Sequence, residues 1–279
     1  MAARLFFQLS HAERCTRCTS DGSAQETMAL NQRILALALL AGIGGASPLH
    51  AQPLLSSRCS DRSVPSVGGV ISGTVGSLGQ LPTRYTAAWL LAGGGAALAT
   101  HPADTEVTRH FSSSERLGDL LGPGSAIGSA AAQLGTGVGT YVIGRISNNS
   151  CVGAVGADLL RAQLVAEALT LAMQYSIRRT RPDGSSFSFP SGHASVAFAS
   201  AAVLQRQFGW KTGVAAYAAA SYVAASRLQA NRHFLSDVVF GAAVGMVSAH
   251  AATLGEKHRL AAFPSLAPGG GGIQFVWIR

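Results

Sequence analysis

Residues 226–240 read SRLQANRHFLSDVVF, and this stretch brings charged side chains into one of the most apolar parts of the chain. The sequence YAAASYVAA (217–225) precedes it, and GAAVGMVSA (241–249) follows it. A charge without a partner in such surroundings is costly. His233 and Asp237 are four residues apart, so their side chains meet if this stretch forms a helical turn. The stretch is therefore either a solvated helix end with a local ion pair or a site that binds an anion.

The composition indicates a helical protein with few charges. The chain has 279 residues, enough for one or two domains; 48% are hydrophobic and 12% are charged, against about 25% charged in an average protein. The formal net charge of +8 suits anionic partners such as phosphate esters or membrane surfaces, although simple solubility explains it at least as well. Dense Lys/Arg tracts with interleaved aromatic residues are missing from the sequence, so nucleic acid is not an expected partner.

The beginning of the chain is typical of a targeting region, which we place at residues 1–51. From Met28, one arginine precedes an apolar run (34–43), and small residues follow. This is the layout of a secretory signal peptide, and a short membrane anchor is the other interpretation. We expect cleavage after Ala51, or alternatively after Ala46, and therefore an exported protein.

Cysteine usage is compatible with export. The expected mature chain keeps Cys59 and Cys151, which either form a disulfide in an oxidising compartment or remain two unrelated buried thiols. Cys15 and Cys18 form a single C-x-x-C pair upstream of the signal region, which is weak support for a zinc site.

The pattern of apolar residues predicts an all-α fold, a compact bundle of about six helices. A polar N-terminal segment (52–80) precedes the helical domain (81–260), and a Gly-rich tail (261–279) forms one short strand or a loose end. The last helical stretch is expected to break near residues 228–233. The six predicted helices span residues 83–99, 108–121, 125–145, 156–179, 194–208 and 213–255.

These helices give no decisive membrane signal. A spanning helix needs about 20 apolar residues, and the uncharged windows of this chain are mostly shorter or rich in Gly and Ser. A compact periplasmic bundle and a membrane-embedded bundle both fit this pattern, and we favour a compact bundle that is soluble or membrane-associated.

Two further segments carry polar residues at helix ends. In QYSIRRTRPDG (174–184), the Arg181–Pro182 pair ends a helix, which leaves several arginines at its C-terminus. Compensation of the helix dipole is the ordinary explanation for such arginines. In FPSGHASVAF (189–198), Ser191 is expected to cap a helix whose first N–H groups can bind an oxyanion, with His193 at the same place. An ordinary capped helix with an incidental histidine is the alternative.

The chemistry of the opening stretch suits phosphoryl transfer. A carboxylate that binds one ring nitrogen of a histidine fixes the tautomer and makes the other nitrogen more nucleophilic, which is the relation expected between Asp237 and His233. Arg227 can donate two parallel hydrogen bonds to phosphate oxygens. An exposed ion pair at i,i+4 spacing is the alternative for the histidine and aspartate alone.

The three segments in this order, RP, then PSGH, then S-R-x5-H-x3-D, resemble the phosphatidic acid phosphatase type 2 superfamily, which also contains vanadium haloperoxidases and bacterial acid phosphatases. The resemblance covers about residues 157–250. It implies an all-α bundle and a phosphohistidine mechanism without a metal. On this resemblance, His233 is the nucleophile, Asp237 orients it, and His193 protonates the leaving oxygen and then activates water. The residues expected to hold the phosphoryl oxygens are Arg181, Arg227, Ser191 and the N–H group of Gly192.

The sequence itself favours catalysis without a metal or other cofactor. Phosphoryl transfer depends on positioning and charge stabilisation. Residues 151–250 contain few carboxylates, so a two-metal site is hard to build and cationic side chains take its place. The carboxylates in this range are Asp158, Glu167, Asp183 and Asp237.

The chain departs from the superfamily pattern at one position. The first motif of the superfamily begins with Lys seven residues before the Arg of RP, and that position here is Gln174. On the resemblance, Gln174 takes the place of that Lys among the phosphate-binding residues; glutamine can donate a hydrogen bond but supplies no charge, and Arg178 and Arg179 are the candidates to compensate. The short gap DGSSFSF (183–189) predicts a small cap over the pocket.

The sequence leads to three functional hypotheses. The first is an exported, metal-independent phosphatase that acts on phosphomonoesters, with lipid phosphates among the candidate substrates. The second is a haloperoxidase that uses vanadate as its cofactor, because vanadate resembles the phosphoryl transition state. The third is a non-catalytic envelope protein with a degenerate phosphate site.

Overall fold

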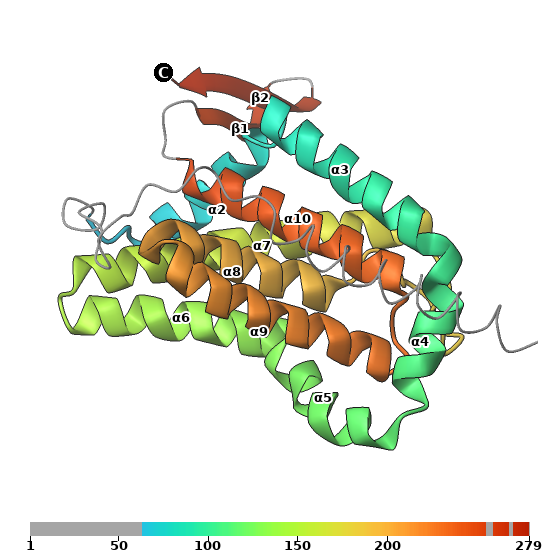
Figure 1. Cartoon of the computed structure of the whole chain (residues 1–279). Coiled ribbons are helices and arrows are strands. Elements are labelled where there is room, and N and C mark those ends of the chain that lie inside the picture. Colours follow the sequence, from blue (N-terminus) through green and yellow to red (C-terminus); the bar gives the residue numbers. More distant parts are fainter. Residues whose placement is uncertain (1–62, 255–258, 268–269, 279) are drawn as a thin grey trace, which may run out of the picture.

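The computed structural model describes residues 63–254, 259–267 and 270–278, and this part of the chain contains nine α-helices and one β-hairpin (Figure 1). The helices are α2 (Val67–Gly79), α3 (Arg84–Thr100), α4 (Asp104–Ser112), α5 (Glu115–Ile127), α6 (Ala130–Ile146), α7 (Ser150–Ile177), α8 (Gly192–Phe208), α9 (Trp210–Gln229) and α10 (Leu235–Thr253). A 3-10 turn, His101–Ala103, joins α3 to α4. The strands are β1 (Arg259–Ala267) and β2 (Gly270–Ile278).

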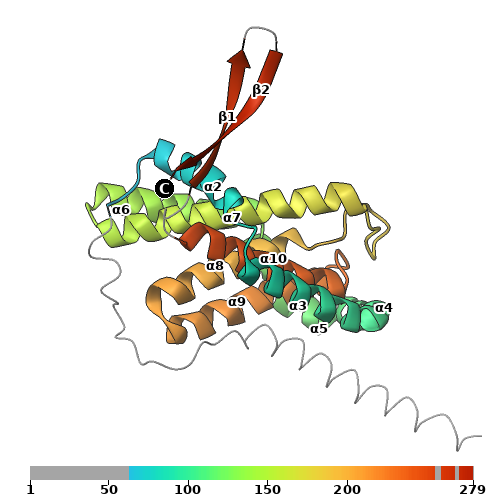
Figure 2. The ribbon, with the colours of Figure 1, turned by 90° about the horizontal axis from the view of Figure 1, so that it is seen from above.

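Helix α8 lies at the centre of the bundle. It packs against α7, α9 and α10, while α3 covers α10, α6 lies along α7, and α5 lies against α9 (Figures 1 and 2). The strands β1 and β2 pair antiparallel, and Figure 2 shows this hairpin projecting from one side of the helices. The interior is therefore built from helix-to-helix contacts, as the predicted all-α class requires, and that class is confirmed for residues 63–254.

Small residues allow α10 to lie very close to its neighbours. A Cβ atom at Gly245 would be 2.3 Å from the carbonyl oxygen of Ser195, and one at Gly241 would be 2.7 Å from that of Ser191. On the other side of α10, a Cβ atom at Gly93 of α3 would be 2.3 Å from the Cβ of Ala243. Only glycine fits at such contacts without moving the backbone. This close approach brings the first turn of α10 beside the first turn of α8.

Local capping sets where several helices begin. The side chains of Ser66, Thr83, Ser114, Ser129 and Asn149 each accept a hydrogen bond from a backbone N–H in the first turn of the following helix. Such caps stabilise a helix end by about 1 kcal/mol. Helix α7 ends at Arg178, whose backbone is left-handed with φ of 53°.

The predicted number of about six helices is wrong, and each extra helix has a local cause. The stretch 108–121 contains parts of two helices, because Ser114 is extended and caps the start of α5. The long stretch 213–255 is two helices, because Asn231 is left-handed (φ 56°) between them, near the predicted break. Helix α2 lies within the segment 52–80 that was treated as polar, where a Gly-rich sequence concealed it.

The predictions for the two ends of the chain concern the tail, the targeting region and a disulfide. The predicted tail (261–279) contains most of β1 and all of β2, so it forms a hairpin rather than a single strand or a loose end. The targeting region 1–51 and Cys59 lie outside the described residues. Cys151 is disulfide-bonded, but its partner also lies outside them, so the pairing of Cys59 with Cys151 stays a prediction.

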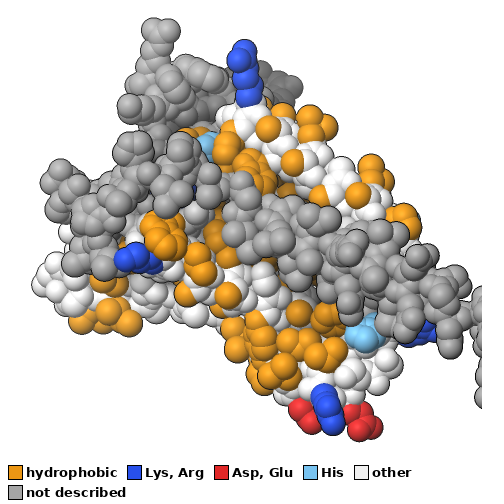
Figure 3. All heavy atoms as spheres, in the orientation of Figure 1, with side chains coloured by type: hydrophobic (Ala, Val, Ile, Leu, Met, Phe, Trp, Pro, Cys, Tyr) orange, Lys and Arg blue, Asp and Glu red, His pale blue; other side chains and the backbone are white. Residues whose placement is uncertain are grey.

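Many large apolar side chains remain at the surface. Leu91 and Leu98 on α3 are each 76% exposed, and Ile146 on α6 is 78% exposed. Figure 3 shows hydrophobic side chains gathered over several helices of one face. Among the described residues, one helix, α10, is long and apolar enough to cross a membrane, and 78% of its apolar window is buried inside the protein.

Candidate active site

The three polar segments of the sequence meet at one end of the bundle, where α7 and α9 end and α8 and α10 begin (Figure 1). The N–H of Ser191 donates to the carbonyl oxygen of Asp237 over 3.0 Å. The amide of Gln174 donates to the carbonyl oxygen of Pro190 over 2.9 Å. These bonds join the end of α7 and the start of α10 to the turn before α8, as the order of the motifs predicts.

His233 is held in one tautomer by a backbone carbonyl. Its Nδ1 lies 2.7 Å from the carbonyl oxygen of Ser188. A carbonyl oxygen only accepts hydrogen bonds, so Nδ1 carries the proton and Nε2 keeps its lone pair. The side chain is only 2% exposed, and burial lowers the pKa of His233 to about 3. A neutral imidazole with a free Nε2 is the form that a nucleophile needs.

Asp237 is connected to His233 through neighbouring groups rather than by the direct hydrogen bond that was expected. Its Oδ2 lies 3.9 Å from Nδ1 of His233, which is too long for a hydrogen bond. That oxygen instead accepts from the hydroxyl of Ser188 at 2.5 Å and from the N–H of Phe234 at 2.8 Å. Asp237 therefore fixes Ser188, whose carbonyl holds the histidine, and the residue that directly follows the histidine.

An arginine and a second aspartate complete this buried network. The guanidinium of Arg179 donates to Oδ1 of Asp237 at 2.6 Å, to Oδ2 of Asp104 at 2.7 Å and to the hydroxyl of Ser236 at 2.8 Å. Asp104 also accepts from the N–H and hydroxyl of Ser236 at the start of α10. Arg179 thus bridges two buried carboxylates and fixes the start of α10 against α4.

The sequence did not reveal the partners in this network. Asp104 lies 132 residues before Ser236, and Ser188 lies 49 residues before Asp237. Ser125 of α5, which accepts from NH1 of Arg227 at 2.8 Å, is 102 residues from that arginine. No local pattern marks such residues, because their role depends on which helices meet.

Cationic side chains surround His233 with little compensating charge. The pKa of Arg227 is lowered to about 10, by burial and by the nearby charges of Arg232 and Arg181. Burial and the charge of Arg232 likewise lower the pKa of Arg181, whose guanidinium donates only weakly to the carbonyl of Phe187 at 3.3 and 3.4 Å. Asp183 pairs with Arg232 at 2.7 Å. Three arginines therefore lie close enough to repel one another, and such an excess of positive charge is typical of a site that binds an anion.

Within the described part of the chain, two buried polar atoms, from Arg227 and Ser191, have no hydrogen-bond partner. One is Nε of Arg227, and the other is the hydroxyl of Ser191, a residue that is 0% exposed. Ser191 occupies the N-cap position of α8, but its side chain does not cap the helix, contrary to the expectation from the sequence. The hydroxyl and the N–H of Gly192 at the first helical position are thus available to an oxyanion.

His193 lies at the same place, on the first turn of α8. Burial and the charge of Arg227 lower its pKa to about 4, although a hydrogen bond with the backbone of Ser125 opposes this. His193 also lowers the pKa of His233 by its charge, so the two imidazoles are neighbours. Without a bound anion, both imidazoles are neutral at pH 7.

The amide of Gln174 is used by the turn before α8, and Arg178 and Arg179 are both engaged elsewhere. Arg179 is fully used by the two carboxylates. Arg178 points its Nε back to the carbonyl oxygen of Tyr175 at 3.0 Å and is exposed. Neither arginine replaces the missing lysine, so Gln174 holds the turn at Pro190 as a neutral donor.

The two carboxylates of the network are bound by arginine. Among the described residues, no group of three or more His, Cys, Asp or Glu side chains is placed to hold a metal ion. Asp237 and Asp104 are both occupied by Arg179. Glu167 is near Gly192, and burial raises its pKa.

The bridge made by Arg179 predicts a large loss of stability when it is removed. Arg179→Met leaves two buried carboxylates without their cation, and breaking a buried pair costs about 3–5 kcal/mol. The control is Arg178→Met at the adjacent exposed residue, with an expected change within about 0.5 kcal/mol. Urea unfolding of the three proteins measures this difference, and equal midpoints for the two variants would disprove the structural role of the bridge.

The two neutral histidines predict a specific pH dependence of stability. Their pKa values in the folded protein, about 4 for His193 and about 3 for His233, lie below the ordinary value of 6.5. The unfolded chain therefore binds protons that the folded protein does not, and stability falls as the pH decreases from about 6.5 to about 4. His193→Asn should flatten this dependence in unfolding midpoints, whereas His110→Asn, at an exposed position, should not. An unchanged slope in His193→Asn would contradict the assignment.

Comparisons with known proteins agree with this geometry. The PAP2 superfamily model matches residues 169–259, the range that contains all three motifs. A lipid A 1-phosphatase of Porphyromonas gingivalis is 42% identical over 96 residues, which cover 30% of this chain and 22% of that protein. The matched segment thus spans about a fifth of that relative's length.

Two solved structures are also similar to this chain. The LpxE structure of Aquifex aeolicus has a TM-score of 0.47 and 18% identity, covering 53% of this chain and 93% of that one. A transmembrane PAP2 type phosphatidylglycerolphosphate phosphatase of Bacillus subtilis has a TM-score of 0.48 and 19% identity, covering 66% and 92%. The segment that carries the site, residues 169–259, is thus the part of this chain that matches the PAP2 superfamily model.

Proposed function

We propose that this protein is a metal-independent phosphatase that hydrolyses phosphomonoesters, with lipid phosphates as its substrate class, through a phosphohistidine at His233. One observation carries the proposal. The Nδ1–H of His233 donates to a carbonyl oxygen, which leaves Nε2 able to act as a nucleophile. Arg181 and Arg227 are close to it, and neither forms a salt bridge with a carboxylate in the described part of the chain. A phosphate group supplies the negative charge that this arrangement needs.

In the first step, Nε2 of His233 attacks phosphorus and the bond to the ester oxygen breaks. His193 gives its proton to that leaving oxygen. Binding of a phosphate dianion beside His193 favours the imidazolium, so the pKa of about 4 in the free protein rises when the substrate is bound. The imidazole of His233 gains positive charge in this step, and Asp237 at 3.9 Å stabilises it.

In the second step, the neutral His193 takes a proton from water. The water oxygen attacks phosphorus, and the bond to Nε2 breaks, which releases inorganic phosphate and restores both histidines. The oxygens of the transferring group are held by Arg181, Arg227, the hydroxyl of Ser191 and the N–H of Gly192. Preorganised donors of this kind are a major source of catalysis when charge spreads over phosphoryl oxygens.

Two observations support lipid phosphates as the substrate class. The relative from Porphyromonas gingivalis, 42% identical over 96 residues, is named a lipid A 1-phosphatase. The exposed leucines and isoleucines of α3 and α6 suit contact with lipid rather than water. We therefore place the protein at a membrane, with its site on the periplasmic side.

The test of the mechanism is the covalent intermediate. Acid quenching during turnover of a ³²P-labelled phosphomonoester should trap acid-labile phosphate on His233, and turnover should continue in EDTA. His233→Ala should lose both label and activity, while His110→Ala keeps them. A fully active His233→Ala protein would end this assignment. Halide oxidation that requires added vanadate, with no ester hydrolysis, would instead support a haloperoxidase, and inactivity in both assays would support a non-catalytic protein.

Because Gln174 is neutral, we expect a lysine at this position to increase the phosphatase activity. Gln174→Lys adds a charge beside the turn at Pro190, and a charged hydrogen bond is roughly twice as strong as a neutral one. The expected gain is on the order of 1–2 kcal/mol in transition-state stabilisation, or roughly ten-fold in kcat/KM. Gln174→Met, which removes the bond to Pro190, is the control and should lower the rate. A rate for Gln174→Lys at or below that of the parent would mean that the pocket is shaped around the amide.

The localisation predicts the N-terminus of the mature protein. Protein recovered from the cell envelope should begin near Gln52, or near Ser47 if the earlier cleavage site is used. N-terminal sequencing after fractionation checks this. An intact N-terminus on protein from the cytoplasm would contradict export, and it would also argue against a Cys59–Cys151 disulfide, because the cytosol is reducing.

A further inference from the structure

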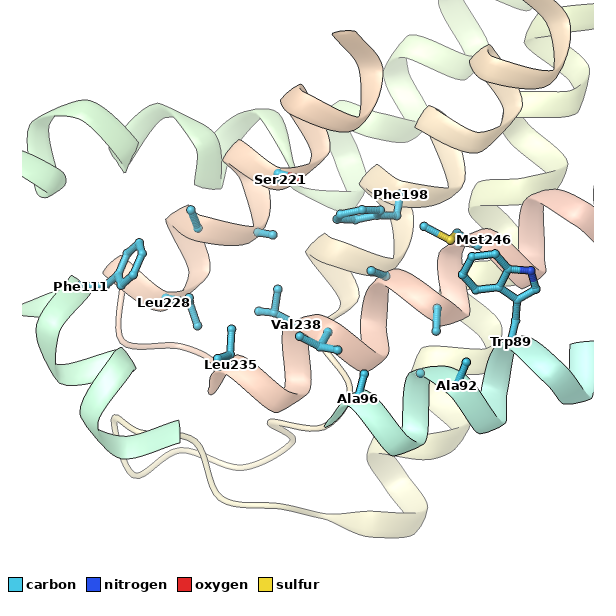
Figure 4. A pocket seen from close by; sticks show the side chains of 16 residues that line it. Trp89, Ala92, Ala96, Phe111, Phe198, Ser221, Leu228, Leu235, Val238 and Met246 are labelled. Atoms are coloured by element: carbon cyan, nitrogen blue, oxygen red, sulfur yellow. The ribbon is translucent and has the colours of Figure 1, made fainter. Parts of the chain in front are cut away.

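An apolar cavity is lined in part by chain neighbours of the candidate site residues and has no role in the chemistry described above. Its walls come from α3, α9 and α10, and Phe198 of α8 closes its inner side (Figure 4). Its volume is about 140 Å³. Ser221 is the one polar side chain among its lining residues; the others are apolar or glycine.

The cavity exists because α3 and α9 rest on different helices. Helix α3 packs against α10, whereas α9 packs mainly against α8. The lining residues of α3 are mostly small, Ala92, Gly93 and Ala96, and those of α9 include Ala224 and Ala225. Short side chains on both sides leave a space that large residues would fill.

One end of the cavity is built from the segment that carries the proposed catalytic residues. Leu228 follows Arg227 directly in the chain, and Leu235 lies between His233 and Asp237. From this end the cavity follows α10 toward Met246, and Figure 4 shows Met246 with Trp89 far from Leu228 and Leu235. The eleven residues from Leu235 to Met246 correspond to about 16 Å along a helix.

We propose that this cavity binds the hydrocarbon chain of the substrate's leaving group. The inference rests on the proposed phosphatase function and adds where the apolar part of the lipid lies. Apolar cavities of comparable size, about 150 Å³, stay dry and take up small hydrocarbons. A molecule with a phosphate at one end and an alkyl chain at the other matches a cationic site and an apolar cavity that are built from neighbouring residues of one segment.

The proposal predicts a dependence of rate on chain length. Each methylene group buried in the cavity improves kcat/KM about four-fold, because burial of a CH₂ group is worth about 0.8 kcal/mol. The improvement should stop when the chain reaches Trp89 and Met246. Primary alkyl phosphates of increasing length, assayed below their micelle concentrations with the full-length protein in one detergent, measure this series by release of inorganic phosphate.

Two substitutions on α3 separate the cavity from the surface. Ala96→Phe fills the cavity from a partly buried lining position, and Ala87→Phe places the same side chain at an exposed position outside it. Ala96→Phe should lower kcat/KM ten-fold or more for long alkyl phosphates and leave the shortest one unchanged. Ala87→Phe should leave the whole series unchanged.

A variant that enlarges the cavity provides a second test in case the Ala96→Phe protein does not fold. Trp89→Ala opens the far end, so the chain length at which kcat/KM stops rising should increase. Hydrolysis at a rate independent of chain length, or equal effects of the two phenylalanine variants, would overturn the cavity proposal while the phosphatase function stands. Absence of hydrolysis for every alkyl phosphate, the shortest included, would overturn the proposed function and this inference with it.

Discussion

The buried carboxylate of Asp237 is the interaction on which the site depends. It accepts hydrogen bonds from Arg179, from the hydroxyl of Ser188 and from the N–H of Phe234. Through these bonds one side chain joins the loop before α8 to the start of α10. Because the carbonyl of Ser188 holds Nδ1 of His233, the orientation of this imidazole follows from the carboxylate even though the two side chains are 3.9 Å apart. Burial raises the pKa of Asp237, and its three donors oppose that change.

The charges around this carboxylate are divided into two groups with different roles. Arg179 lies between Asp104 and Asp237 and is fully paired, so it stabilises the structure. Arg181 and Arg227 have no carboxylate partner within salt-bridge distance in the described part of the chain, and Nε of Arg227 has no partner there at all. An arginine that is buried without a carboxylate is costly. That cost is offset when an anion binds, so the arrangement suits the phosphate site that we propose.

The apolar surroundings have consequences for both catalysis and substrate. They lower the pKa values of His193 and His233, so that both start as free bases, and they strengthen the electrostatic effect of each arginine. The same packing of small residues that brings α10 close to α8 leaves the cavity between α3 and α9. The polar site and the apolar cavity thus both use residues at the end of α9 and the start of α10.

Local sequence determined the helical class and most of the residues that meet at the site. The motifs around Arg181, Ser191 and His233 could be identified because their spacing is short and their chemistry is specific, and the structure brings them together. Only the tertiary structure decided the partners. It replaced the direct bond between Asp237 and His233 by a carbonyl, left the hydroxyl of Ser191 free of the helix cap, and used Arg179 for Asp104 rather than for phosphate. These outcomes depend on contacts between residues up to 132 positions apart, which follow from how closely whole helices pack and leave no periodic pattern in the chain.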